Sequence, residues 1–188
     1  MEQARADFAF LANTADAKVH LVEDRAGLGV ATQFLTNVHG WDEAAAARAG
    51  DSGNRMVWVV TVARWDDDLP GMATLRQVSR QSDPAGLTAR SMHYTRGVCS
   101  AFLMRDASAA AAANGLIDGV AIKAAFEAMR DHVPTDLEGV RLPGSWTPTD
   151  RQGSTTVRLY RTDHNFGAIS TRHVYTTTMP LRPDWLGW

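Results

Sequence analysis

The sequence predicts an α/β protein whose chain is divided between two lobes. The beginning of the chain shows strand, helix and strand patterns in turn, the middle is a block of helical patterns, and the end returns to strands. A strand–helix–strand order within about thirty residues is typical of a parallel sheet. We therefore expect sheet segments from both ends of the chain to share one lobe while the middle helices pack elsewhere.

The first part of the chain predicts three strands and two helices. The segments DFAFLA (7–12), VATQFLTN (30–37) and RMVWVVTVARW (55–65) have strand patterns; we expect the first to be buried, and the third is too continuously apolar to face water. The segment 15–29 predicts a helix that ends at Gly27 and Gly29. A short helix follows, with Asp42 near its start and Gly50 after its end. The apolar face that we expect on the first helix consists of Ala17, Leu21, Val22 and Ala26.

The middle and the end of the chain change from helices back to strands. Residues 66–81 begin with three acids and Pro70 and continue with a helical pattern. Acids at a helix start suit the helix dipole, and proline suits the first turn. A long alanine-rich helix is expected to stop at Gly115. The next predicted helix, in residues 116–132, has an apolar face of Ile122, Ala125, Phe126 and Met129. The final strands are predicted in GVRLPGSW (139–146), STTVRLYRT (154–162) and RHVYTTTM (172–179).

Composition excludes several classes of function. The 188 residues are 45% hydrophobic and 21% charged, with a net charge of −2, so the basic stripe expected of a nucleic-acid-binding protein is missing. A single cysteine, Cys99, excludes an internal disulfide and a thiolate-rich metal site. No apolar run is long enough to span a bilayer. The N-terminal MEQARADFAF lacks the basic and apolar regions of a signal peptide.

Short motifs offer candidate sites, and each has a simpler interpretation. GLGVAT has two glycines of a dinucleotide-binding loop but precedes a strand, which favours a helix end. HGWDE could offer metal ligands, but no partner motif such as HExxH occurs, and helix capping by Asp42 is the simpler interpretation. A third interpretation is better than either: His39 and Trp41 follow the end of a strand, where ligands bind. The acids of RWDDD lack the alternating spacing of a calcium loop. Ser91 and His93 do not make a nucleophile and base, and Cys99 is expected to be buried and inert.

A series of segments resembles one known family in the right order along the chain. These segments are ADFAFLANTADAKVHLVEDRAGLGVATQFLTNVHGWDE, WDDDLPGM, HYTRGVCSAFLM, GLIDGVAIKAAFEAM, WTPTDRQGSTTVRLYRTD and PLRPDWLGW. Together they resemble the solute-binding proteins of branched-chain-amino-acid ABC transporters, which have the type I periplasmic-binding-protein fold. The resemblance implies a two-lobe, three-layer αβα architecture.

The family's proteins are much longer, so the chain corresponds to roughly their C-terminal half and the fold is incomplete. By this resemblance, residues 1–63 and 138–188 belong to the second lobe. Residues 64–137 are helices of the first lobe, whose sheet this chain does not contain. Their apolar faces are then expected to be exposed or to be covered by the missing N-terminal lobe or a second chain.

The resemblance implies ligand capture for import, outside the cytoplasm and together with an ABC permease. The ligands would be small amino acids or related aromatic carboxylates. No catalytic residue, metal or cofactor is expected, and no nucleic acid. His39 and Trp41 follow the carboxyl end of a strand, where open α/β sheets bind ligands. The ligand-binding residues implied by position are Asn13, Thr14, Asn37, Val38 and His39 in the second lobe, Trp65 near a hinge, and Tyr94 on the first-lobe side.

Two other classes of function stay open at this point. The same fold serves as a ligand-sensing regulatory or receptor domain, and nothing in the sequence separates that function from import. An α/β enzyme would need a nucleophile or a cofactor loop at a strand end, and the sequence shows neither.

Overall fold

The structure, a computed structural model, describes residues 6–165 and 167–180. Most of the resembling segment PLRPDWLGW lies outside the described residues. The chain forms two compact units. Unit 1 comprises Met1–Val60 and Arg158–Thr176, and unit 2 comprises Thr61–Val157 and Thr177–Trp188.

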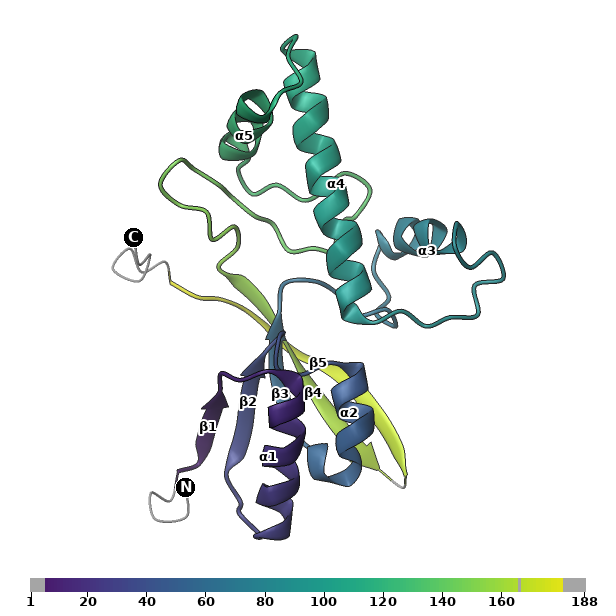
Figure 1. Cartoon of the computed structure of the whole chain (residues 1–188), viewed down its shortest axis with the longest axis vertical. Coiled ribbons are helices and arrows are strands. Elements are labelled where there is room, and N and C mark those ends of the chain that lie inside the picture. The colour runs from purple at the N-terminus through teal and green to yellow at the C-terminus, as the bar shows by residue number, and fades with distance from the viewer. Residues whose placement is uncertain (1–5, 166, 181–188) are drawn as a thin grey trace. The chain divides into compact units, whose positions relative to one another are not determined.

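Unit 1 is built on a mixed five-stranded sheet in the order β1-β2-β3-β4-β5 (Figure 1). The first three strands are parallel neighbours, and β4 is antiparallel to β3. The parallel part confirms the predicted α/β class, because parallel neighbours need helical crossovers. The strands are β1 (Phe8–Leu11), β2 (Gln33–Asn37), β3 (Val57–Val60), β4 (Thr156–Asn165) and β5 (Ala168–Thr178).

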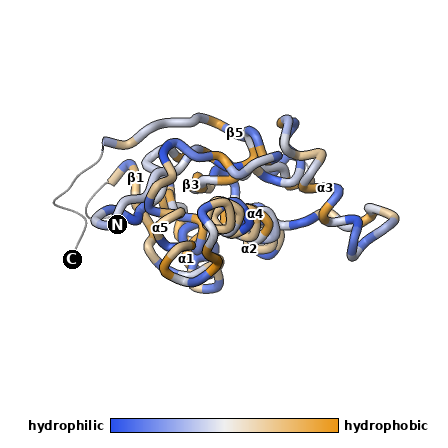
Figure 2. The backbone as a smooth tube through the Cα atoms, turned by 90° about the horizontal axis from the view of Figure 1, so that it is seen from above, coloured by the Kyte–Doolittle hydropathy of each residue, from blue (hydrophilic) through white to orange (hydrophobic). Residues whose placement is uncertain are grey.

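Helices α1 (Ala15–Gly27) and α2 (Glu43–Ala49) lie on the same side of this sheet (Figures 1 and 2). A short 3-10 helix, η1 (Gly50–Gly53), follows α2. Asp42 caps α2 by accepting a hydrogen bond from the amide of Ala45 at 2.7 Å, as predicted. Gly29 takes the left-handed conformation just after α1, with φ 66°, which confirms the predicted helix end.

The core of unit 1 lies between these helices and one face of the sheet. Phe34 of β2 is fully buried, and the Trp58 and Tyr160 rings of β3 and β4 pack with centroids 5.5 Å apart. The buried face of α1 differs from the predicted one. It consists of Lys18, Val19 and Val22, whereas Ala26 is exposed. Lys18 lies within the stripe that faces the sheet, so an apolar pattern alone misplaces the face.

The opposite face of the sheet is only partly covered. We predicted β1 as a buried strand, but Phe8 and Phe10 are 66% and 61% exposed. In β3, Val57 and Val59 are half-buried, although the sequence indicated a strand shielded on both faces. The predicted strands exist, and the burial prediction was wrong because the helices of unit 1 cover only one face.

The regular structure of unit 2 consists mainly of three described α-helices joined by long loops. Within α4, one stripe of buried side chains includes Met92, Cys99, Leu103 and Ala107, at helical spacing. Helix α4 ends just before Gly115, which has φ 87°, as predicted. The helices are α3 (Met72–Arg80), α4 (Met92–Ala113) and α5 (Gly119–Ala128).

The segment 139–146 is not the strand that we predicted. It makes isolated bridges only, between Val62 and Arg141, His132 and Gly144, and Ser145 and Gly153. Pro143 cannot donate a ladder hydrogen bond, which disfavours a regular strand at this position. The last two predicted strands correspond to β4 and β5.

Candidate functional site

The candidate site in unit 1 lies at the carboxyl ends of β1 and β2. Leu11 is paired in register with Thr36, so the loops that follow the two strands begin side by side. The first loop carries Asn13 and Thr14, and the second carries residues 37–39. Because the strands are parallel neighbours, five of the seven residues implied by resemblance come from one edge of the sheet.

The first loop presents exposed polar groups. The Asn13 Oδ1 atom accepts a hydrogen bond from the amide of Thr14 at 2.8 Å, and Thr14 is the N-cap of α1. The Thr14 hydroxyl makes no capping hydrogen bond to the described residues of α1. Both side chains are exposed, so the hydroxyl can donate to or accept from a ligand.

The second loop is a tight turn. The Asn37 Oδ1 atom accepts from the amide of His39 at 3.1 Å, and the amide of Gly40 donates to the carbonyl of Asn37, also at 3.1 Å. This is the side-chain turn that asparagine favours. Asn37 and Val38 are half-buried, and His39 is exposed. The turn therefore fixes the Asn37 side chain and leaves the imidazole of His39 open to solvent.

A buried lysine supports this edge, and the sequence analysis missed it. The Lys18 ammonium donates to the Thr36 hydroxyl, which donates to the carbonyl of Leu11 at 2.9 Å. Lys18 has no exposed surface, and burial lowers the pKa of its ammonium. A Cβ atom placed on Gly40 would overlap the Lys18 Nζ atom. One signal was available in the sequence. Lys18 lies four residues before Val22, so helical spacing places it on the face of α1 that packs on the sheet.

The other two implied residues form a separate cluster in unit 2. The rings of Trp65 and Tyr94 meet edge to face, with centroids 6.2 Å apart and an interplanar angle of 82°. The Arg90 guanidinium lies 5.1 Å from the centre of the Tyr94 ring. Trp65 and Tyr94 are half-buried. The structure thus brings Trp65 into contact with Tyr94 and places the first five residues at one edge of the sheet.

The acids near Trp65 do not have the predicted place at a helix start. Helix α3 begins at Met72 after Gly71, and its first turn contains no acidic residue. Asp67 instead accepts from the amide of Arg64 at 2.9 Å, closing a turn before the helix. Pro70 also precedes the helix. The acids were assigned to the wrong element because the turn adds residues between them and α3.

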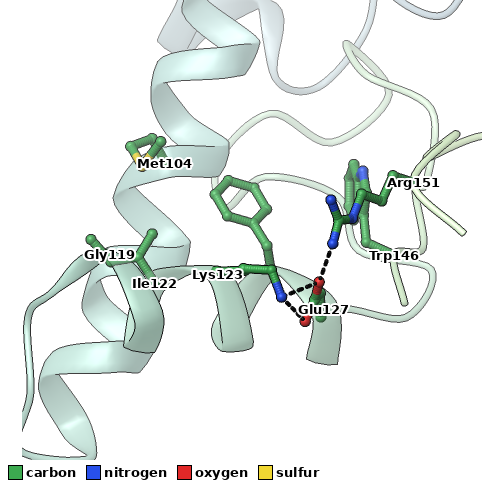
Figure 3. Close-up of a pocket in the computed structure, with 8 residues that line it drawn as sticks. Met104, Gly119, Ile122, Lys123, Glu127, Trp146 and Arg151 are labelled. Atoms are coloured by element: carbon green, nitrogen blue, oxygen red, sulfur yellow. Dashed lines mark hydrogen bonds and ion pairs between the residues drawn. The ribbon is translucent and has the colours of Figure 1, made fainter. Parts of the chain in front are cut away.

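A cavity of about 420 Å³ lies elsewhere in unit 2, lined by α4, α5 and the segment that follows (Figure 3). None of the seven implied residues lines it. Across the described residues, no group of three or more His, Cys, Asp or Glu side chains is placed to hold a metal. No helix in the described part of the chain has the length and apolarity that a membrane crossing needs. Cys99 is buried, as expected.

Comparisons with known proteins give a family from the sequence and a fold from solved structures. The sequence model of the family described as "periplasmic binding protein" matches residues 1–167. The solved substrate-binding protein of an ABC transporter from Aeropyrum pernix has a TM-score of 0.76 and 21% identity, covering 99% of this chain and 48% of that chain. A branched chain amino acid ABC transporter from Thermus thermophilus with bound valine has a TM-score of 0.74 and 18% identity, covering 95% and 47%.

A solute binding protein from R. palustris, in complex with 4-hydroxybenzoate, has a TM-score of 0.71 and 20% identity, covering 98% of this chain and 48% of that chain. At these identities the likeness shows the fold. The chain spans about half the length of these solved proteins. Among curated protein sequences, none matches the chain significantly.

Proposed function

The chain belongs to the periplasmic binding protein family, and from this premise we propose that it forms part of the solute-binding component of an ABC importer. The ligand would be a small amino acid or a related aromatic carboxylate. Two proteins of similar fold support these ligand classes, since one was solved with bound valine and another in complex with 4-hydroxybenzoate. The family works by binding rather than by catalysis, and we extend that to this chain.

The observation that carries the proposal is the pair of loops at the carboxyl ends of β1 and β2. Thr14 contributes a hydroxyl that is exposed and does not cap its helix. Asn37 contributes an amide held by the turn, and His39 an exposed ring. These groups can hydrogen-bond the ammonium or carboxylate of a ligand, and the imidazole can stack on an aromatic ring.

Trp65 and Tyr94 would add an aromatic wall from the other lobe. Their edge-to-face packing gives a rigid apolar surface with a phenolic hydroxyl at its margin. Closure of two lobes on a ligand is a common hinge motion in binding proteins. In this proposal each cluster contributes ligand contacts from its own lobe, and binding requires the complete fold.

The lobe assignment and the partners are also proposals. We assign residues 1–63 and 138–188 to the second lobe and 64–137 to the first. The compact units differ from this assignment, because residues 61–63, 138–157 and 177–188 are grouped with the helices. The rest of the fold, in the same or another chain, would complete both lobes. Coverage of only about half of the similar proteins supports this. An ABC permease and a periplasmic or extracellular location would then follow from the family.

The test uses the chain joined to the half of the fold that it lacks. The double substitution Thr14→Ala with His39→Ala removes two hydrogen-bonding groups from the proposed site. At about 1 kcal/mol each, their loss should weaken binding at least tenfold. Isothermal titration with valine and with 4-hydroxybenzoate measures the affinity.

A matched control is the double substitution His20→Ala with Thr88→Ala, which changes the same residue types at exposed positions outside the two loops. It should leave the affinity unchanged. Equal affinities for the control and the test variant would show that the strand-end loops are not the binding site.

A further inference from the structure

The cavity in unit 2 has a composition that suits a ligand of its own. Its volume of about 420 Å³ is within the range of small-molecule sites. Figure 3 shows its side chains converging from α4, from α5 and from the segment beyond α5. The lining residues are Met104, Gly119, Ile122, Lys123, Phe126, Glu127, Trp146 and Arg151.

Helix α5 directs one complete face toward this cavity. Its five lining residues follow the spacing i, i+3, i+4, i+7 and i+8 from Gly119, which is a single helical face. Among the described residues of α5 none is buried, and Ile122 and Phe126 on this face are half-buried. Their apolar surface is therefore available to a molecule that enters the cavity.

The aromatic side of the cavity is held in place. The rings of Phe126 and Trp146 pack edge to face, with centroids 6.1 Å apart. The amide of Trp146 donates to the carbonyl of Met129 at 3.2 Å, and the Arg130 guanidinium donates to the carbonyl of Trp146. A Cβ atom on Gly144 would lie 2.6 Å from the Trp146 ring, so the backbone packs closely against the indole. A prearranged aromatic wall lowers the entropy cost of binding.

The polar side of the cavity carries one surplus positive charge. Glu127 accepts hydrogen bonds from Lys123 and from Arg151, each at 3.0 Å. The Glu127 side chain is 14% exposed, whereas those of Lys123 and Arg151 are 57% and 58% exposed. Two cations thus share one carboxylate and keep open sides toward solvent. An apolar protein surface would have to desolvate all three charges, whereas a small anion would balance the surplus charge.

We propose that this cavity is a binding site for a small aromatic monocarboxylate, separate from the strand-end loops of unit 1. The aromatic body would pack against Phe126, Trp146 and Ile122. The carboxylate would accept hydrogen bonds from the Lys123 ammonium and the Arg151 guanidinium. Hydrogen bonds between such charged groups are among the strongest in proteins. This proposal does not depend on the proposed function, because it concerns different residues.

The first test is a nuclear magnetic resonance titration of the 188-residue chain with 1-naphthoate. We expect saturable shifts of the backbone amides of Gly119 and Lys123 and of the Trp146 indole, with smaller or no shifts at Thr14 and His39. The neutral isostere 1-naphthamide should bind about fivefold more weakly, because it lacks a charge for the cations. Shifts confined to the strand-end loops, or equal affinity for the neutral isostere, would overturn the proposal.

The second test compares two arginines in matched settings. Arg151 pairs with Glu127, and Arg172 pairs with Asp163; the arginine side chains are 58% and 55% exposed and the carboxylates 14% and 13%. Arg151→Gln should weaken naphthoate binding about fivefold, and Arg172→Gln should leave it unchanged. Equal effects of the two substitutions would contradict a specific site.

Glu127→Gln distinguishes a ligand site from a merely structural ion pair. Removing the carboxylate frees both cations for the ligand, so naphthoate should bind more tightly than to the unsubstituted chain. Thermal unfolding of each variant establishes that it is folded. If folded Glu127→Gln binds naphthoate more weakly, the assignment of the cations to the ligand is wrong.

Discussion

The two faces of the unit 1 sheet use the same strands but have very different surroundings. On the face under α1 and α2, Phe34, Trp58 and Tyr160 are at most 1% exposed. On the other face, Phe8 and Phe10 are 66% and 61% exposed. Side chains alternate along a strand, so adjacent residues such as Phe34 and Leu35 belong to opposite faces. The difference therefore comes from what covers each face and not from residue type.

This contrast indicates which part of the sheet holds unit 1 together. Parallel strands are normally covered on both faces, and here the described helices cover one. The register places Phe10 beside Leu35 and Leu35 beside Val57, so an apolar row crosses three strands on the open face. A row of this kind is suited to contact with the rest of the fold, in line with a chain that spans about half of the similar proteins.

The largest expected difference between the faces is in the cost of removing a phenylalanine ring. Phe34→Ala leaves a cavity under α1 and should lower the free energy of unfolding by about 3–5 kcal/mol. Phe10→Ala, on the neighbouring strand, removes a ring that is mostly in water and should cost less than about 1 kcal/mol. Urea denaturation of both variants measures the two costs.

The same pair tests whether the open face is an interface. In the complete protein, Phe10→Ala should become more costly than in the isolated chain, because the ring would then be buried by the missing half. If Phe10→Ala costs several kcal/mol in the isolated chain already, the face is covered in solution and the comparison fails.

The sequence was informative about elements and less so about their surroundings. Apolar runs, periodicity and turn residues located the five strands and five α-helices of the described residues, since these depend on local chemistry such as the Asp42 cap and Gly29. Burial of β1 was predicted wrongly, because an apolar strand has the same pattern whether or not a partner covers it. Residues 139–146 were taken as a strand, although Pro143 interrupts the ladder.

The site depended on information beyond local pattern. Resemblance supplied the seven candidate residues, and the parallel pairing of β1 and β2 places five of them at one edge. Lys18 was missed because its burial depends on a long-range hydrogen bond to Thr36. The unit 2 cavity was missed for a similar reason: Trp146 and Arg151 join α5 only in three dimensions.

A smaller effect is expected where the covered face meets the strand-end loops. Gly40→Ala would place a methyl group on the Lys18 Nζ and Thr36 Oγ1 atoms, so the loop must shift. We expect a loss of about 1–3 kcal/mol in the free energy of unfolding. Gly27→Ala is the control, because a Cβ at this position in α1 meets nothing within 4 Å. It should be neutral or slightly stabilising, by up to about 1 kcal/mol. If the two substitutions lower the free energy of unfolding equally, the cost of Gly40→Ala does not come from the contact with Lys18.

The smallest effect concerns an ion-pair group on the open face. Asp163 lies on the same face of β4 as Leu159 and Arg161. Burial alone would raise the pKa of its carboxyl. Hydrogen bonds from Arg161 and Arg172 outweigh this effect and lower the pKa below 3.8. Because the folded pKa lies below the unfolded one, the stabilisation is fully present above pH 3.8 and is lost as the pH falls through the lowered pKa. Asp163→Asn should therefore cost about 0.5–1 kcal/mol at pH 7, and the difference should shrink on acidification through that range.

The matched control for this last effect is Asp16→Asn, which removes a carboxylate that is 85% exposed and pairs with Arg48 on the helical side of unit 1. It should cost only about 0.3 kcal/mol in urea denaturation at pH 7, because the exposed pair contributes little and what is lost is a favourable interaction with the α1 dipole. A cost for Asp163→Asn that persists unchanged at acid pH would mean that the charge of the carboxylate is not what stabilises this edge. Packing, and not the ion pair, would then stabilise the open face. The two faces of the sheet would differ only in how much apolar surface they bury.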